Sequence, residues 1–236
     1  MGVKACLNGA RTRGEHHAVP LTAAELARDA LAARRAGAFA VHVHPRDGAG
    51  AETLDAAACD AALTAIRAAA GDLPVGLSTA EAIEPDPFAR ASAIGAWRNP
   101  PDFVSVNVGE VGWAGTIRAA LHAGIGVEAG LSSPADASEL AGSPFAHRLV
   151  RALVEVDGGV DEARAIAELV PEGVAQLWHG SGVRTWEILL AGAAAGHDVR
   201  VGLEDVLVLP DGRDATGNAE LIECAVALTQ QPGEPL

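Results

Sequence analysis

Residues 21–50 read LTAAELARDALAARRAGAFAVHVHPRDGAG and predict a helix followed directly by a strand. Thr22 and Glu25 have the spacing of a capping box, and the leucines and alanines behind them recur at helical spacing. Gly37 ends this helix, because glycine adopts the left-handed conformation of a helix C-terminus at little cost. The apolar run that follows alternates small and β-branched residues, as a buried strand does, and Pro45 begins the loop that leaves it.

The rest of the chain repeats this pairing of strand and helix. We predict eight strands, in residues 3–8, 38–44, 74–78, 102–108, 124–130, 148–156, 174–180 and 199–205. We predict eight helices, near residues 22–36, 54–70, 86–97, 113–123, 135–141, 160–169, 182–196 and 216–229. Such alternation is typical of parallel βαβ units, and eight of them favour a single (β/α)8 TIM barrel of the α/β class spanning residues 1–236. A doubly wound open sheet is the alternative, since the fifth helix has the least regular pattern.

Composition excludes several kinds of partner. The net charge of −14 argues against a nucleic-acid or anionic membrane surface, and no apolar stretch reaches the roughly 18 residues of a membrane span. The N-terminus lacks the pattern of an export signal. The three cysteines are Cys6, Cys59 and Cys224, and their odd number and wide spacing favour reduced thiols and a cytoplasmic protein.

Two histidines stand one residue apart at the exit of the second predicted strand. His42 and His44 share a strand face and lie roughly 6 to 7 Å apart along it. In a barrel this exit is the mouth where active sites gather, so both imidazoles can converge on one metal ion. The alternative is a pair of separately hydrogen-bonded histidines at a strand end.

The last predicted strand carries a second group of polar residues. Arg200, Gly202 and Glu204 are expected on one face of it, whereas Asp205 faces the other way or begins the loop. A barrel interior rarely accepts an unpaired charge, so Glu204 is a candidate third metal ligand. Two histidines and one carboxylate leave a coordination position open, as in catalytic zinc sites. An internal ion pair of Arg200 with either carboxylate is the structural alternative.

Two segments together carry a resemblance to a known family. Residues 21–50 and residues 182–205, GVRTWEILLAGAAAGHDVRVGLED, resemble the β-keto acid cleavage enzymes. In that family a His-x-His followed by Arg-Asp ends the second barrel strand, and an Arg-Val-Gly-x-Glu-Asp segment lies at the eighth. The similarity runs from about residue 5 to residue 229.

The resemblance implies a zinc-dependent reaction in which a β-keto acid and acetyl-CoA give acetoacetate and a new acyl-CoA. His42, His44 and Glu204 match the family's zinc ligands. Asp205 matches its acid/base residue, and Arg200 matches an arginine that assists that residue. The resemblance also implies a homo-oligomer, as a tetramer.

Five further residues are candidates for the site, and three of them match the family more loosely. Ser78 and Asn107 end the third and fourth strands, where the family contacts its substrate, although Ser78 also suits a cap. Glu128 matches a family glutamate of the catalytic site, and a glutamate inside an apolar strand favours function. Gly180 and Ser181 precede a helix, where backbone N–H groups can receive a phosphate or carboxylate of the substrate. An ordinary tight turn is the alternative for this pair.

The chain also departs from the family. Several loops are shorter than is usual, including those that shape the acyl pocket and the CoA channel. Arg11 and Arg13 stand where the amino-keto acid member carries a glutamate, so we expect a substrate with a neutral or anionic tail. Glu155, after the sixth strand, fits an exposed loop carboxylate better than a site residue. Arg46 and Asp47 are expected to fix the loop and to hold the imidazoles.

Other classes of protein fit part of the pattern. A metal-dependent hydrolase of the amidohydrolase kind also uses His-x-His, but on the first strand, with further histidines from strands five and six. A barrel that only binds a metal or a metabolite would use the same ligands. A Schiff-base aldolase would have to use Lys4, the only lysine, which lies at the start of the first strand and far from the mouth.

Overall fold

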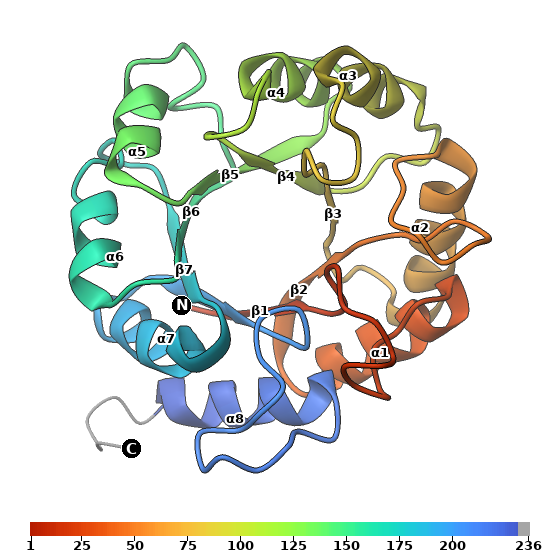
Figure 1. Cartoon of the computed structure of the whole chain (residues 1–236), viewed down its shortest axis with the longest axis vertical. Helices are drawn as coiled ribbons and strands as arrows, with labels where there is room; N and C mark the ends of the chain where they lie inside the picture. Colours follow the sequence, from red (N-terminus) through yellow and green to blue (C-terminus); the bar gives the residue numbers. More distant parts are fainter. Residues whose placement is uncertain (231–236) are drawn as a thin grey trace.

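Eight parallel strands close into a barrel in the computed structural model, which describes residues 1–230 (Figure 1). The strands are β1 (Val3–Cys6), β2 (Ala38–Val43), β3 (Val75–Ser78), β4 (Phe103–Asn107), β5 (Gly126–Leu131), β6 (Arg151–Val156), β7 (Gln176–Gly180) and β8 (Asp198–Val201). They follow one another around the ring in chain order, and β8 pairs with β1. The predicted barrel is thus confirmed, and the open sheet is excluded. The last six residues of the predicted range 1–236 lie outside the described part.

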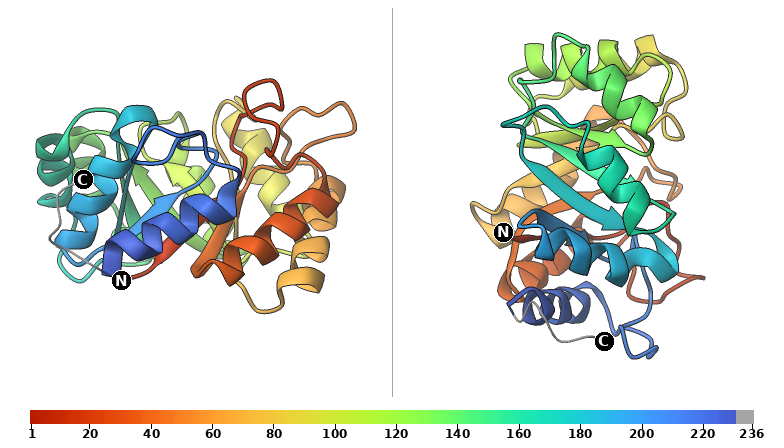
Figure 2. Two further views of the ribbon diagram at one scale, coloured as in Figure 1. Left: turned by 90° about the horizontal axis from the view of Figure 1, so that it is seen from below. Right: turned by 90° about the vertical axis from the view of Figure 1, so that its left-hand side faces the viewer.

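Helices surround this barrel on all sides (Figures 1 and 2). They are α1 (Ala23–Arg35), α2 (Ala56–Ala70), α3 (Pro87–Ala96), α4 (Trp113–His122), α5 (Pro134–Ala141), α6 (Val160–Ala167), α7 (Thr185–Ala194) and α8 (Asn218–Gln230), with a short 3-10 helix, η1 (Gly182–Arg184), before α7. The irregular fifth segment is therefore a helix, capped by Ser133, whose hydroxyl accepts from the N–H of Asp136.

The predicted capping box of α1 is present. The side chain of Thr22 accepts a hydrogen bond from the N–H of Glu25, and the Glu25 carboxylate accepts one from the N–H of Thr22. The helix buries Leu26, Ala27 and Ala30 on its inner face. The capping box fixes the start of α1, and α1 in turn fixes where β2 begins. His42 and His44 therefore come at the exit of this strand, at the mouth of the barrel.

The last strand is shorter than predicted. The sequence suggests a strand over 199–205, whereas β8 ends at Val201 and the chain turns, with the Gly202 carbonyl accepting from the N–H groups of Asp205 and Val206. A Cβ atom on Gly202 would lie 1.9 Å from the carbonyl oxygen of Cys6, so this turn packs against β1 only because the residue is glycine. Glu204 and Asp205 therefore stand in a turn and not in the strand.

The interior of the barrel has a lower level, toward the amino ends of the strands, and an upper level at their carboxyl ends. At the lower level Lys4 of β1 lies 2.5 Å from Glu128 of β5, and Arg151 of β6 approaches the same carboxylate at 3.2 Å. The Phe103 ring fills the space beside Gly76, where a Cβ atom would be 2.0 Å from the ring. Charged pairs and an aromatic ring thus close the bottom, and the polar residues of the strand ends occupy the top.

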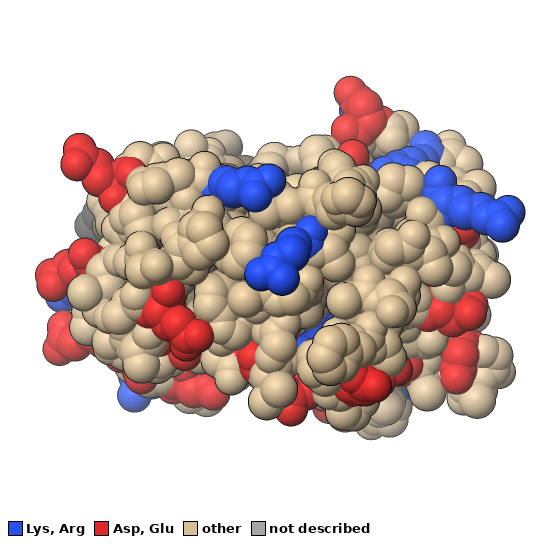
Figure 3. Space-filling model, turned by 90° about the horizontal axis from the view of Figure 1, so that it is seen from above, with Lys and Arg blue, Asp and Glu red and all other residues tan. Residues whose placement is uncertain are grey.

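The surface agrees with the acidic composition. On the face drawn in Figure 3, basic side chains stand singly or in small groups, and acidic ones gather toward its edges. None of the helices within residues 1–230 combines the length and the apolar character needed to cross a bilayer.

Candidate active site

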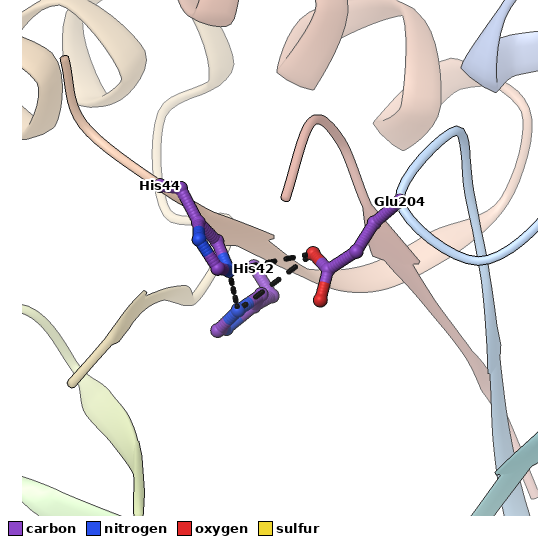
Figure 4. Close-up of side chains that lie close together, drawn as sticks. All are labelled: His42, His44 and Glu204. Carbon is purple, nitrogen blue, oxygen red and sulfur yellow. Dashed lines mark hydrogen bonds and ion pairs between the residues drawn. The ribbon is translucent and has the colours of Figure 1, made fainter. Parts of the chain in front are cut away.

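The two histidines and Glu204 converge at the carboxyl ends of the strands (Figure 4). The Nε2 atoms of His42 and His44 are 3.0 Å apart. The Oε2 atom of Glu204 lies 3.8 Å from the first and 3.6 Å from the second. A tetrahedral zinc ion with bonds of about 2.0–2.1 Å would separate its ligand atoms by roughly 3.3 Å. The three side chains thus have the spacing of ligands around one ion.

Glu204 reaches this point because the first strand leaves room for it. β1 lies between β2 and β8, and its exit includes Gly9, which adopts a φ of +53°. A Cβ atom on Gly9 would lie 2.5 Å from the Cγ atom of Glu204. Glycine is therefore required here both for the backbone conformation and for the approach of the carboxylate.

Two residues that the sequence analysis did not single out hold His44. The Asn8 amide donates to the carbonyl of His44 at 2.8 Å and accepts from its N–H at 2.9 Å. The Glu52 carboxylate hydrogen-bonds the Nδ1 atom of His44, which leaves Nε2 directed at the other ligands. A carboxylate on the far nitrogen of a metal-binding histidine fixes its tautomer and orientation.

The loop after His44 is fixed partly as expected. Arg46 donates to the carbonyls of Gly9 and Arg11, and Asp47 accepts from the N–H groups of Ala49 and Ala51. Neither contact reaches an imidazole, and Glu52 makes that contact instead. A glutamate eight residues beyond the histidine gives no local signal in the sequence, because only the return of the loop brings it back.

The electrostatic state of the three side chains fits a metal. Burial, and then the charge of neighbouring His44, holds the pKa of His42 well below its ordinary value, so this imidazole is neutral and has a lone pair to offer. The Oε2 atom of Glu204 is buried and has no hydrogen-bond partner among residues 1–230. A buried carboxylate oxygen facing two imidazoles without a partner is what a cation would satisfy.

Arg200 binds both carboxylates that follow β8. Its Nη2 atom lies 2.9 Å from Oε1 of Glu204 and 2.6 Å from Oδ1 of Asp205, and its Nε donates to the same Oδ1 at 3.2 Å. The ion pair considered as a structural alternative is thus present, and it coexists with the ligand arrangement because Glu204 uses its other oxygen toward the histidines. Burial outweighs the charge of Arg200 and raises the pKa of Asp205, whose Oδ2 atom has no partner within residues 1–230.

A cavity of about 290 Å³ opens beside the three candidate ligands. Ser78 and Asn107 are on its wall, as expected for residues that contact a substrate, and Asn107 also donates to Glu110 at 2.8 Å. Asp205 is 2% exposed and does not line this cavity. The lining residues lie on or just after β1, β2, β3, β4, β6 and β8 and are Gly9, Ala10, His42, His44, Ser78, Ala80, Ser105, Asn107, Leu153, Glu155, Arg200 and Glu204.

Several expected site residues lie elsewhere. Glu128, expected among the catalytic residues, is at the lower level of the barrel in its ion pairs with Lys4 and Arg151, and it does not line the cavity. It faces inward as its strand position requires, but it stands too early in β5 to reach the mouth. Lys4 is fully buried in the same pair, which agrees with rejecting a Schiff-base mechanism.

The segment after β7 also differs from expectation. Gly180 and Ser181 were expected to bind the substrate, but the Ser181 hydroxyl donates to Asp157. The N–H of the next residue, Gly182, donates to the backbone carbonyl of Asp205 at 2.8 Å. Neither residue of the pair lines the cavity beside the candidate ligands, but Ser181 lines a second cavity of about 570 Å³ that shares Glu155 with it. The segment also forms a tight turn that packs against Asp205.

Two polar residues of the mouth differ from the sequence prediction: Glu155 was predicted outside the site, and His179 was not predicted as a site residue. Glu155, expected as an exposed loop carboxylate, lines the cavity. His179 of β7 is 1% exposed and lies 3.3 Å from the Glu155 carboxylate. Burial acts to raise the pKa of Glu155, but the charges of His179 and Arg200 outweigh it and lower that pKa to about 2. The position of His179 near the end of a predicted strand was a signal for a site residue in the sequence, but its partner Glu155 is 24 residues away.

Arg11 and Arg13 do not enter the cavity. Arg11 pairs with Glu15 at 2.8 Å, and Arg13 pairs with Glu25. Their positive charges are therefore compensated outside the site, and the argument for a neutral or anionic substrate tail loses its basis.

Comparisons with known proteins concern the family of the chain and its fold. The 3-keto-5-aminohexanoate cleavage enzyme of Fusobacterium nucleatum subsp. nucleatum is 25% identical over 255 residues, which cover 99% of this chain and 93% of that protein. Among solved structures, a ternary complex of ObcA with a C4-CoA adduct and oxalate has a TM-score of 0.70 at 16% identity, over 89% of this chain and 63% of that one. A type I 3-dehydroquinate dehydratase from Clostridium difficile has a TM-score of 0.60 at 9% identity, over 97% and 92% of the two chains.

The two structural likenesses establish the fold alone, and this chain spans less than two thirds of the length of ObcA. The sequence comparison goes further. The model of the family described as beta-keto acid cleavage enzyme matches residues 1–156 and 156–236, which is the whole chain. The chain belongs to the β-keto acid cleavage enzyme family.

Proposed function

We propose that this protein is a zinc-dependent enzyme that converts a β-keto acid and acetyl-CoA into acetoacetate and a new acyl-CoA. The observation that carries the proposal is the adjacency of Glu204 and Asp205. One carboxylate faces two imidazoles, and the next residue is a buried carboxylate held by Arg200 with one oxygen free. A metal ligand that lines the cavity and a buried acid/base group directly behind it are thus supplied by consecutive residues, and Arg200, which also lines the cavity, contacts both.

Each residue has a task in this proposal. His42, His44 and Glu204 hold the zinc ion, which when bound supplies a Lewis acid that stabilises the enolate of the keto acid. Ser78 and Asn107 on the opposite wall of the cavity bind the carboxylate end of the substrate. Asp205 removes a proton from the carbon between the two carbonyl groups, and Arg200 keeps that carboxylate in place.

The atoms of the reaction balance without a redox partner. The carbanion at C2 of the β-keto acid forms a bond to the acetyl carbon of acetyl-CoA. The bond between that carbon and sulfur breaks, as does the bond between C2 and C3 of the acid. The CoA sulfur then takes the remaining acyl group, and C2, which keeps the acetyl group and the electron pair of the broken bond, takes back the proton held by Asp205 to give acetoacetate.

The comparisons support this reaction class. The relative from Fusobacterium nucleatum is named for the cleavage of a β-keto acid, and the ObcA structures are named for complexes with oxaloacetate and with a C4-CoA adduct. The hydrolase alternative has less support, because strands β5 and β6 supply glutamates and no histidine to the barrel interior.

The proposal also includes the cellular location and the oligomeric state of the protein. All three cysteines are free, which supports the reducing environment of the cytoplasm. We propose a homo-oligomer, as a tetramer, on the family resemblance, and light scattering after size-exclusion chromatography measures it.

The deciding experiment is an assay of purified, zinc-loaded protein with acetyl-CoA and a panel of β-keto acids with neutral, anionic and cationic tails. Formation of acetoacetate and the matching acyl-CoA is followed by mass spectrometry. We expect the enzyme to convert the β-keto acids of one of these three tail classes. Release of acetate or ammonia from esters or amides, with no acyl-CoA from any keto acid, would assign the protein to the hydrolases. Zinc binding without turnover of either kind would favour a binding protein.

A further inference from the structure

A buried histidine stands between Glu155, which lines the cavity, and Asp205, the proposed acid/base residue. The Nε2 atom of His179 lies 3.3 Å from Oε2 of Glu155, and its Nδ1 atom lies 3.9 Å from Oδ1 of Asp205. Glu155 and His179 are paired residues in the register of β6 and β7, so the sheet itself fixes their contact. The imidazole thus connects β6 with the turn after β8.

The segment that carries His179 also holds the backbone of Asp205. The N–H of Gly182 donates to the Asp205 carbonyl at 2.8 Å, and the Thr185 hydroxyl lies 3.5 Å from that carbonyl and 3.0 Å from the carbonyl of Gly180. Gly182 has a φ of +56°, a conformation that glycine adopts without strain. One short segment, residues 179–185, therefore contacts both the main chain and the side chain of Asp205.

The ring of His179 is not explained by packing alone. It is 1% exposed, and neither of its nitrogens has a hydrogen bond of good geometry within residues 1–230. Buried polar atoms without partners are uncommon and costly, and they concentrate where a ligand or a reaction supplies the missing contact. Hydrogen bonds of catalytic groups are often long before substrate binds and shorten in the complex.

We propose that His179, held by Glu155, is a positioning residue that fixes the carboxylate of Asp205 for proton abstraction. This inference rests on the proposed role of Asp205. Arg200 binds one oxygen of that carboxylate from the strand side, and His179 approaches the same oxygen from β7. Held from two directions through Oδ1, the carboxylate keeps Oδ2, which has no partner within residues 1–230, free to accept a proton.

Two substitutions of His179 distinguish the contact of its Nδ1 atom with Asp205 from the contact of its Nε2 atom with Glu155. His179→Asn places an amide near the position of Nδ1 and keeps a polar contact to Asp205. His179→Gln reaches toward Glu155 and leaves the Asp205 side without a partner. We expect His179→Gln to lower kcat by roughly 10- to 100-fold, as loss of an outer-shell partner does, with KM within about 3-fold. His179→Asn should retain at least about five times the kcat of His179→Gln.

A second measurement reports on Asp205 without acetyl-CoA. Acetoacetate is incubated with zinc-loaded enzyme in D2O, and loss of its C2 hydrogens above the uncatalysed rate is followed by NMR. The exchange rate should fall in His179→Gln by the same factor as kcat, with unchanged zinc content, and should recover in His179→Asn. Glu162→Gln is the matched control, because Glu162 is a nearby carboxylate that bonds the N–H of Gly158 and does not touch His179.

The outcomes are distinct. Wild-type protein that neither exchanges nor turns over would overturn the proposed function, and with it this inference. Active wild type with unaltered exchange and kcat in His179→Gln would overturn the inference alone, as would equal losses in Glu162→Gln. If neither His179 variant folds, Glu155→Gln replaces them: a kcat lowered several-fold at unchanged zinc content supports the positioning role, and wild-type kcat assigns His179 to the core.

Discussion

The Nε2 atoms of His42 and His44 lie 3.0 Å apart, with Oε2 of Glu204 within 3.8 Å of both. Burial holds the pKa of His42 well below its ordinary value, and a hydrogen bond between two neutral imidazoles would satisfy these nitrogens but leave the buried Oε2 atom of Glu204 without a partner within residues 1–230. A divalent cation satisfies all three atoms together. Each feature of the site can be tested separately.

His42→Ala should abolish stoichiometric zinc binding, because it removes one of three ligands and leaves Glu204 without a second imidazole. Metal content after dialysis, measured by atomic emission, checks this. His17→Ala is the control, since His17 is exposed and should leave the zinc content at the wild-type level. Full zinc retention by His42→Ala would contradict the ligand assignment.

Glu52→Gln should weaken zinc binding by about 10- to 100-fold, because the carboxylate that orients His44 becomes a neutral amide. Competition with a chromogenic chelator measures the affinity. Glu172→Gln, an exposed carboxylate before β7, should bind zinc as the wild type does. Equal affinities in both variants would show that Glu52 only supports its loop.

Asp205→Asn should keep its zinc and lose turnover by about 10²- to 10⁴-fold, the usual contribution of an acid/base group. The amide preserves the shape of the side chain and still accepts from Arg200, so the fold should persist. Zinc content, circular dichroism and kcat are measured on the same sample. A variant with substantial kcat would remove Asp205 from the acid/base role.

Glu128→Gln should act on stability and not on chemistry. It leaves the ammonium of Lys4 buried without its charged partner, and breaking a buried pair from one side costs about 3–5 kcal/mol of unfolding free energy. Urea denaturation measures this loss, and kcat of the folded protein should stay near wild type. Unchanged stability with lost turnover would restore Glu128 to the catalytic residues.

Asp29→Asn should stabilise the protein at pH 7.5 and not at pH 4. Burial raises the pKa of Asp29 to about 6, opposed by a hydrogen bond from Asn218. Because the folded pKa exceeds the unfolded one, Asp29 favours folding below its unfolded pKa, and that contribution is lost as the pH rises through about 6. Urea denaturation should therefore show a gain of about 3 kcal/mol for the variant at pH 7.5. An equal gain at both pH values would exclude titration of Asp29 as the cause.

The sequence by itself determined the barrel and its central histidines. Alternation of strand and helix patterns predicts parallel units, and eight of them predict a closed ring, which the structure confirms. The period of two residues in a strand places His42 and His44 on one face, and their position at the strand exit places them at the mouth. These are local properties of the chain, so short stretches of sequence suffice to predict them.

Only the tertiary structure decided which polar residues meet. The same period of two predicts that Glu128 faces inward, but not that it lies at the lower level beside Lys4, 124 residues away. Glu52 reaches His44 because a loop returns, and His179 meets Asp205 because β7 pairs with β8. The level at which an inward side chain lies in the barrel depends on the register of its strand. Contacts between residues at the exits of different strands depend on that register and on the closure of the barrel. Those arise from pairing across the whole chain, and no single stretch of sequence encodes them.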